Sequence, residues 1–137
     1  MTDAALTWMP HKGRMLLLAS VEALTEREIR CRAKDHRGAD YPLRLDGVLH
    51  PIALVELGAQ AAAAHASIHG VGGAHAGLLL ALKDVRVHRE DEPRAPLMVQ
   101  ATRLGDGPGG AQYSFEIWEE DGMILTGEAL LAMRALP

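Results

Sequence analysis

Two polar side chains stand out in the most apolar stretch of the chain, HPIALVELGAQAAAAHASI, which runs from His50 to Ile68. Glu56 and Gln60 are four residues apart, so on a helix they share one face. A buried carboxylate without a partner is costly. Either this face is solvated at a groove or a subunit contact, or the carboxyl group has a chemical task. A Glu that apolar neighbours keep protonated can act as a general acid.

Histidines near this acid in the sequence are candidates for the matching base. His50 directly precedes the helix, whose first turn offers main-chain N–H groups that suit a carbonyl oxygen or an anion. A base at that position and an acid one or two turns along the helix would form a workable acid–base site. His36, in the loop segment DHRGADYPL, is an equal candidate. Each histidine can also be read as a surface residue, and His11 is expected to anchor the N-terminus.

Other kinds of chemistry find less support in the sequence. His65 and His69 have the spacing of metal ligands on a helix, but no carboxylate is near them and the pair crosses the helix end. No metal site is therefore predicted. The glycine clusters do not form a phosphate-binding loop, and no serine lies in a GxSxG turn. Cys31 falls on the apolar face of its strand, which favours a core position over a nucleophile.

The helix that carries Glu56 is expected to run from Pro51 to about Ile68. Pro51 suits the first helical position, where its missing N–H costs nothing. The segment is almost entirely apolar, so the helix should be covered on most sides. Two strands are predicted before it, RMLLLASVEAL and the strictly alternating REIRCRAK.

Four strands are predicted after the helix. They are AGLLLALKDVRVHRE, PLMVQATRL, AQYSFEIWEE and MILTGEALLAMRAL. The composition of the last segment would also allow a helix, but it follows a hairpin-turn signal at Asp121–Gly122, which favours a strand. Two strands, one apolar helix and four mostly antiparallel strands predict an α+β fold in which a sheet curls around the helix.

Length and composition favour one domain, residues 1–137, with an aliphatic core, because 48% of the residues are hydrophobic and only 4% are aromatic. The net charge of -4 argues against nucleic-acid binding. One cysteine excludes a disulfide framework and fits a reducing compartment. The N-terminus lacks a signal-peptide pattern, and no uninterrupted apolar run reaches membrane-spanning length. We therefore expect a cytoplasmic protein without a membrane partner.

The charge is uneven along the chain. Residues 1–44 carry eight Lys/Arg and six Asp/Glu, a net of +2, so the remainder carries -6. Such a run of basic residues is usually a solvated face, but it can also dock an acidic partner. The basic residues concerned are Arg30, Arg32, Lys34, Arg37 and Arg44.

Three segments resemble the hotdog-fold family of β-hydroxyacyl-acyl-carrier-protein dehydratases. They are PHKGRMLLLASV, DGVLHPIALVELGAQAAAAHA with its Glu-x-x-Ala-Gln motif, and LLLALKDVRVHRE. The chain is similar, more narrowly, to a divergent branch from aryl-polyene and related fatty-acid-like pathways, in which NPLR–x–x–G–x–L–P precedes the helix. The matching stretch here reads YPLRLDGVLHP, and the resemblance extends over nearly the whole chain from about Pro10.

The resemblance implies a hotdog fold, in which a curled antiparallel sheet of about six strands surrounds one long helix. It implies a 3-hydroxyacyl thioester on acyl carrier protein as substrate, and no cofactor. A His removes the α-proton, an acid on the helix protonates the departing hydroxyl, and main-chain N–H groups near the helix start hold the carbonyl oxygen. Such proteins usually form dimers with the acyl tunnel at the contact, and the His and the acid of one site come from different subunits. A homodimer, a higher oligomer or a heterodimer with a paralogue is therefore expected.

Carried over residue by residue, the resemblance places Glu56 at the acidic position and makes Gln60 and Pro51 candidate substrate-binding residues. The base does not carry over, because the His-Phe-Pro-Gly loop of the family is replaced by YPLR, with Pro42 at the His position. Either His36 or His50 then supplies the base, or the chain is a degenerate subunit that supports an active paralogue. Thioester hydrolysis on the same fold is a further alternative.

Overall fold

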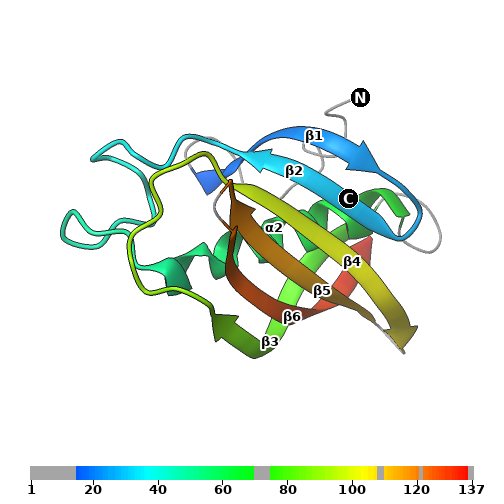
Figure 1. The fold of residues 1–137 in the computed structure, drawn as a ribbon. Helices are drawn as coiled ribbons and strands as arrows, with labels where there is room; N and C mark the ends of the chain where they lie inside the picture. Colours follow the sequence, from blue (N-terminus) through cyan, green and yellow to red (C-terminus); the bar gives the residue numbers. More distant parts are fainter. Residues whose placement is uncertain (1–14, 70–74, 108–109, 121, 136–137) are drawn as a thin grey trace.

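Six antiparallel strands form one curved sheet around a long helix in the computed structural model of the protein (Figure 1). The structure describes residues 15–69, 75–107, 110–120 and 122–135. The helix α2 (Val55–His69) continues a short 3-10 turn, η2 (Pro51–Leu54). The strands are β1 (Leu18–Leu24), β2 (Glu28–Ala33), β3 (His75–Val87), β4 (Met98–Gly107), β5 (Gly110–Glu119) and β6 (Gly122–Ala135). Their order in the sheet is β1-β2-β4-β5-β6-β3, which leaves β1 and β3 at its two edges.

The predicted α+β fold, with two strands, an apolar helix and then four strands, is confirmed. The last segment is a strand despite its helix-favouring composition, because β6 pairs with β5 on one side and with β3 on the other. The strand β6 begins at Gly122, whose φ of 137° is a backbone conformation that suits glycine. Asp121, the other residue of the predicted turn, lies outside the described residues.

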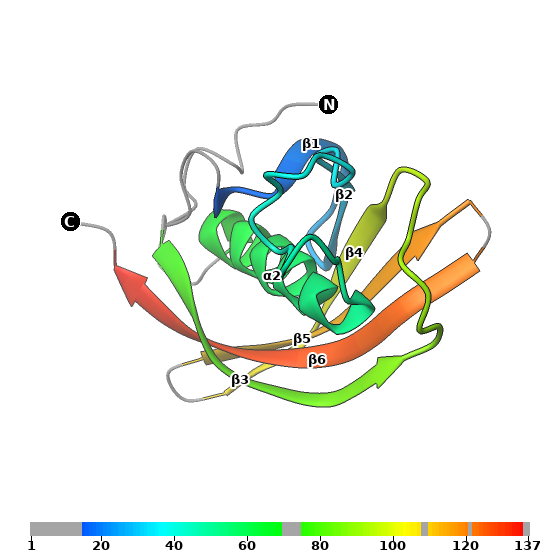
Figure 2. The same cartoon turned by 90° about the vertical axis from the view of Figure 1, so that its left-hand side faces the viewer.

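The helix α2 lies in the concave face of the sheet and contacts all six strands (Figure 2). Every residue from Leu57 to Ser67 is buried, so the prediction of a helix covered on most sides is confirmed. The helix is rich in alanine, and these short side chains let the strands approach its backbone closely. The larger core side chains are mainly Leu, Ile, Tyr and Phe, and they come from the sheet, from the loops and from Leu54 and Leu57 of the helical segment.

The only phenylalanine of the chain, Phe115 on β5, packs between two glycines. A Cβ atom built at Gly58 of α2 would lie 2.2 Å from Phe115 Cδ1. A Cβ atom built at Gly127 of β6 would lie 2.7 Å from Phe115 Cζ. The helix can therefore reach β5 at this point only because position 58 has no side chain.

We expect Gly58→Ala to lower the free energy of unfolding by up to about 2 kcal/mol, since the close contact puts overpacking near the upper end of about 1–3 kcal/mol and the helix-propensity gain is about 1 kcal/mol. Urea denaturation measures this change. Gly105→Ala is the control, because a Cβ atom there meets open space. A Gly58→Ala protein more stable than wild type would contradict the close contact.

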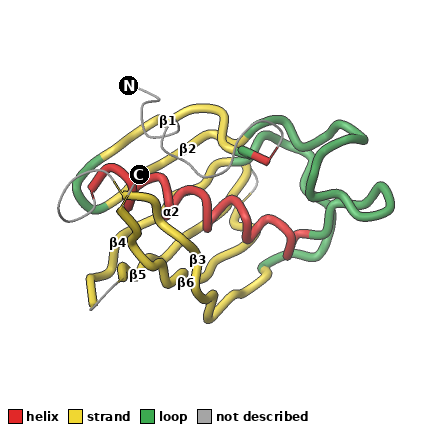
Figure 3. The backbone as a smooth tube through the Cα atoms, turned by 180° about the vertical axis from the view of Figure 1, so that it is seen from behind, coloured by secondary structure: helices red, strands yellow, loops and turns green. Residues whose placement is uncertain are grey.

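Loops gather at the end of the sheet where the helix begins (Figure 3). One is the segment 34–50 between β2 and η2, and the other is the segment 88–97 between β3 and β4. The first contains a tight hairpin in which Leu45 and Val48 exchange main-chain hydrogen bonds of 2.9 and 3.0 Å. Asp46 and Gly47 at its tip have φ of 53° and 80°, as a two-residue turn between paired strands requires. These two loops carry most of the candidate site.

None of the helices in the described part of the chain is long and apolar enough to cross a membrane.

Candidate acid–base site

Glu56 and Gln60 lie one turn apart near the start of α2, and a hydrogen bond joins them. Gln60 Nε2 donates to Glu56 Oε1 at 3.3 Å and to the main-chain oxygen of Met15 at 2.6 Å. Gln60 Oε1 accepts from the Leu17 N–H at 2.9 Å. The prediction that the two side chains share a face is confirmed by this bond.

Burial separates the two residues of this pair. Gln60 is fully buried, and both ends of its amide bind groups of the same chain. Glu56 is half-buried. Gln60 therefore ties the helix to the segment that leads into β1 and orients Glu56, while a contact of Gln60 with substrate remains a prediction.

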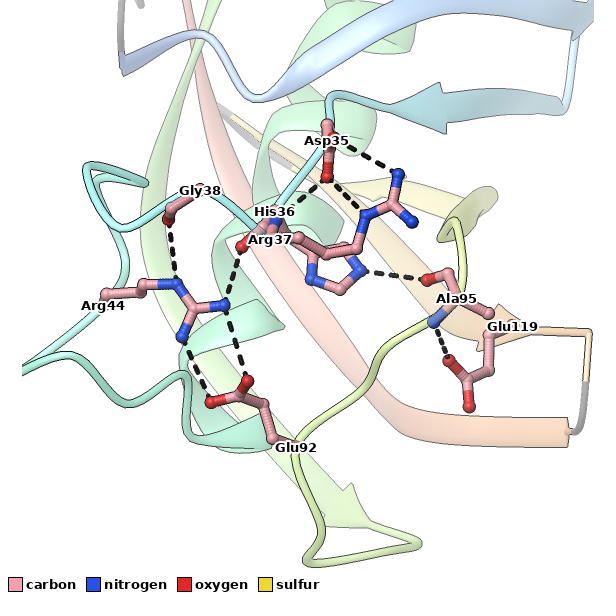
Figure 4. A network of polar contacts seen from close by, with 8 residues as sticks. All are labelled: Asp35, His36, Arg37, Gly38, Arg44, Glu92, Ala95 and Glu119. Carbon is pink, nitrogen blue, oxygen red and sulfur yellow. Dashed lines mark hydrogen bonds and ion pairs between the residues drawn. The ribbon is translucent and has the colours of Figure 1, made fainter.

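His36 is buried, with 1% of its surface exposed, in the loop after β2. Its ring Nε2 lies 2.9 Å from the main-chain oxygen of Ala95 (Figure 4). Because a carbonyl oxygen only accepts, we infer that Nε2 carries the ring proton and that Nδ1 is unprotonated in the neutral ring. Nδ1 is buried and has no hydrogen-bond partner in the described part of the chain.

The loop that carries His36 is held by Arg44, whose side chain is only 9% exposed. Its guanidinium donates to Glu92 of the neighbouring loop at 3.1 and 3.4 Å (Figure 4). It also donates, at 3.0 Å each, to the main-chain oxygens of His36, Gly38 and Gly47. The sequence placed Arg44 on a basic surface, and this was wrong, because the side chain is buried by these contacts within its own loop.

Glu92 completes the connection between the two loops. Its carboxylate accepts from the Leu49 N–H at 2.9 Å in addition to Arg44. The Leu49 N–H, together with Arg44, lowers the pKa of Glu92. The segment just before η2 is therefore fixed by the same carboxylate that holds the loop of His36.

A second carboxylate fixes the carbonyl that orients His36. Glu119, at the end of β5, is buried and accepts from the Ala95 N–H at 3.1 Å. The guanidinium of Arg89 pairs with the same carboxylate. Ala95 is thus held on its N–H side while its oxygen binds the His36 ring, which Figure 4 shows from close by.

His50 and Pro51 lie where the helical segment begins. Pro51 is buried at the first position of η2, as predicted, and His50 is exposed just before it. The His50 side chain makes no capping hydrogen bond, but its main-chain oxygen accepts from the Ala53 N–H at 2.9 Å. The structure therefore distinguishes the two candidate bases, since His36 is buried with its ring oriented by a hydrogen bond, whereas His50 is exposed.

A groove of about 540 Å³ lies beside the loop of His36. Leu17 lines it, and the Leu17 N–H binds Gln60, so the groove is connected to Glu56 through two hydrogen bonds. The residues that line the groove are Leu17, Lys34, Asp35, Gly38, Asp40, Tyr41 and Pro42.

Tyr41 is a groove residue that the sequence did not single out. It is 7% exposed, and its hydroxyl has no partner in the described part of the chain. Burial raises the pKa of Tyr41 to about 12, so the phenol stays protonated near neutral pH. Its ring lies edge-on to that of His36, with 6.3 Å between the centroids. The only sequence signal was the position of Tyr41 in the YPLR motif.

The outer face of β2 is basic, as its alternation predicted, but its charges are partly paired. Arg32 forms an ion pair with Glu22 at 3.2 Å. Arg30 donates to Gln100 and lies 5.7 Å from the centre of the Trp118 ring. Cys31 is fully buried on the opposite face, which confirms its predicted core position.

At the other end of α2, His65 is fully buried with both ring nitrogens engaged. Nε2 donates to the main-chain oxygen of Thr25 at 2.9 Å, and Nδ1 accepts from the Tyr113 hydroxyl at 2.5 Å. Both nitrogens therefore bind protein groups. Among the described residues, no three His, Cys, Asp or Glu side chains cluster as metal ligands would.

His65 should make the protein sensitive to acid, because burial lowers its pKa to about 4. Between the ordinary His pKa of about 6.5 and pH 4, His65 is protonated in the unfolded chain but stays neutral in the folded chain. The free energy of unfolding should therefore fall by about 3 kcal/mol as the pH drops through this window. Urea denaturation at pH 7, 5.5 and 4 measures the decline.

His65→Gln should remove most of that decline, whereas His69→Gln, at the less buried end of the helix, should retain it. Equal pH slopes in wild type and His65→Gln would assign the acid sensitivity to another group.

The comparisons with known proteins agree with the sheet and helix described above. A family model described as ApeP dehydratase, of the ApeP-like family, matches residues 4–133. No curated protein matches the chain by sequence.

Among solved structures, the chain is similar to the dehydratase heterocomplex ApeI:P from Xenorhabdus doucetiae. The TM-score is 0.74, with 22% identity over 92% of this chain and 88% of that chain. It is also similar to a hypothetical thioesterase with coenzyme A from Streptococcus pneumoniae, with a TM-score of 0.66 and 13% identity over 85% of each chain. A thioesterase from Haemophilus influenzae gives a TM-score of 0.66 and 18% identity over 85% of this chain and 78% of that chain. The predicted hotdog fold is confirmed.

Proposed function

Because the chain belongs to the ApeP-like dehydratase family, we propose that it takes part in removing water from 3-hydroxyacyl chains on acyl carrier protein. The reaction would belong to a fatty-acid-like or polyene biosynthetic pathway. The protein would act in the cytoplasm. The observation that carries the proposal is Glu56, a half-buried carboxyl group on an otherwise apolar central helix. Its hydrogen bond from Gln60 orients it without closing it off.

The proposed reaction needs one base and one acid. A histidine takes the α-proton, which the thioester carbonyl acidifies, and the C–H electrons form the new double bond as the C–O bond at C3 breaks. Glu56 gives its proton to the departing hydroxyl, which leaves as water. Main-chain N–H groups near Pro51 would hold the carbonyl oxygen. His36, through Nδ1, and His50, at the surface, are the two candidates for the base.

Two alternatives share this scaffold. The similarity to thioesterase structures supports a reaction in which Glu56 activates a water that cleaves the thioester. The similarity to a heterocomplex, together with the YPLR loop that lacks the family's histidine, supports a subunit that assists an active paralogue.

The edge strand β3 supports assembly into a dimer, either with a second copy or with a paralogue. Residues 79–84 are all exposed, on both faces of the strand, and they include Leu79, Leu80 and Leu82. An uncovered edge of this length readily pairs with another strand. A shared contact would also let the acid of one subunit meet a histidine of the other.

We expect light scattering to give at least twice the chain mass of 14.7 kDa. Leu80→Glu should shift the protein toward monomer, while Leu104→Glu, which changes another exposed leucine but on β4, should not. If the wild-type protein is a monomer, Glu56 cannot lie at a contact shared between two subunits.

The test of function is mass spectrometry of a 3-hydroxyacyl carrier protein incubated with the purified chain. Loss of water would establish dehydration, and loss of the acyl group would establish a thioesterase. Binding of the carrier without either change would indicate a non-catalytic subunit. Co-purification with a paralogue would then identify the active partner.

A further inference from the structure

The face of the sheet that points away from α2 carries an apolar strip at its loop end (Figure 2). Along β5 every second residue is buried, and the residues between them, which include Glu116 and Trp118, lie on the outer face. Trp118 pairs with Met98 of β4 on one side and with Met123 of β6 on the other, and all three are only partly buried. The solvated face of an antiparallel sheet normally carries polar side chains, whereas tryptophan and methionine are enriched in protein–protein interfaces.

Two arginines of β2 flank this strip. Arg32 pairs with Met98 across the sheet, and the guanidinium carbon of Arg30 lies 5.7 Å from the centre of the Trp118 ring. Both arginines are exposed, and arginine is also enriched in interfaces. In the described part of the chain Arg30 forms no ion pair, and neither does the exposed Glu116. The outer face therefore combines an apolar centre with two opposite charges that are not paired within the subunit.

Arg30 and Glu116 lie one strand to either side of β4. Gln100 of β4 pairs with Arg30 on one side and with Glu116 on the other. Two sheets that pack face to face keep their strands nearly aligned. A two-fold axis that runs along β4, between two copies packed in this way, brings Arg30 of each copy opposite Glu116 of the other copy. Two ion pairs then form, one on each side of the axis.

The neighbouring row of residues fits the same axis. Met98 of β4 pairs with Arg32 and with Trp118, so each Arg32 lies opposite the Trp118 ring of the other copy. Met98 of one copy meets Met98 of the other, and no like charges are opposed in the two rows. An axis over β5 would instead bring Arg30 opposite Arg86, which lies two strands from β5 on its other side. The charges therefore select β4 as the centre of the contact.

We propose that the outer face of the sheet binds a second copy of this chain through a patch formed by Arg30, Arg32, Met98, Glu116 and Trp118. The patch is centred on β4, three strands away from the β3 edge, so the two contacts form independently of each other. Together they join four subunits. If a paralogue occupies the β3 edge, this chain is the subunit through which two heterodimers associate. The inference does not depend on the reaction that the protein performs.

The first test starts from Leu80→Glu, which disrupts the β3 contact and leaves the patch intact. The shift of this variant toward monomer should stop at the outer-face dimer, with twice the chain mass of 14.7 kDa by light scattering. Adding Arg30→Glu places glutamates opposite each other at two points and should weaken this dimer by more than about 100-fold, and Glu116→Arg should do the same. Combining the two charge reversals should restore the dimer.

Arg86→Glu is the matched control, because it reverses an exposed arginine of β3 outside the patch and should leave the dimer intact. Thermal unfolding checks that each variant is folded. Cross-linking of otherwise wild-type protein gives a second readout, since residue 98 meets its own copy at the axis and the native Cys31 is buried. A short bifunctional maleimide should join two Met98→Cys chains, and it should not join two chains with Leu130→Cys, an exposed position on β6.

A monomeric Leu80→Glu protein, or a dimer that neither charge reversal weakens, would overturn the outer-face contact, as would a Met98→Cys protein that does not cross-link. None of these results bears on the dehydratase function, which the carrier-protein assay tests separately.

Discussion

Glu56→Gln should lower the rate of water loss from a 3-hydroxyacyl carrier protein by about 10²–10⁴-fold, the usual contribution of a general acid. A glutamine has the shape of Glu56 but cannot give a proton to the departing hydroxyl. Its amide oxygen can still accept the hydrogen bond from Gln60 Nε2, so the start of α2 should keep its conformation. The comparison therefore isolates proton transfer from folding.

Single-turnover mass spectrometry measures the rate, and thermal unfolding checks that both proteins are folded. Glu56→Asp retains an acid on a shorter side chain and should keep part of the activity. Glu120→Gln removes an exposed carboxylate just after β5 and should leave the rate unchanged. Normal turnover by Glu56→Gln would exclude Glu56 from the reaction and favour another acid, in this chain or in its partner.

Arg44→Met should lower the free energy of unfolding by about 1–3 kcal/mol, because the Arg44 side chain, only 9% exposed, donates to three main-chain oxygens. Glu92, whose side chain is 30% exposed, stays solvated and adds little to this loss. After the substitution, the Glu92 carboxylate still accepts a hydrogen bond from the Leu49 N–H. The three main-chain oxygens that Arg44 binds lose their donor. Urea denaturation measures the loss.

Two further variants sharpen this prediction. Arg44→Lys keeps the charge but lacks the planar fork that reaches several acceptors, so it should be intermediate. Arg37→Met breaks an ion pair with Asp35 in which both side chains are more than half exposed, and should leave the free energy of unfolding almost unchanged. Equal losses in Arg44→Met and Arg37→Met would show that the bridge between the two loops does not stabilise the fold.

The fold was predictable because its signals are local. Alternation defined β2, a long apolar run with proline at its first position defined the helical segment, and a hairpin signal assigned the last segment to the sheet. Spacing alone also put Glu56 and Gln60 on one face. Each of these inferences depends on residues within one element or one turn.

The surroundings of the site depend on residues far apart in the sequence, and the sequence could not supply them. His36 and His50 were equal candidates until the Ala95 oxygen, 59 residues from His36, was found to orient the buried ring. Arg44 looked like a surface charge because its partner Glu92 is 48 residues away. The role of Tyr41 depends on burial, which its motif does not reveal.

The open edge of β3 also has a consequence for the life of the newly made chain. A strand of 13 residues with exposed leucines at an edge of the sheet can pair with a strand of another chain while it stays uncovered. Assembly would then compete with aggregation and degradation from the moment of synthesis.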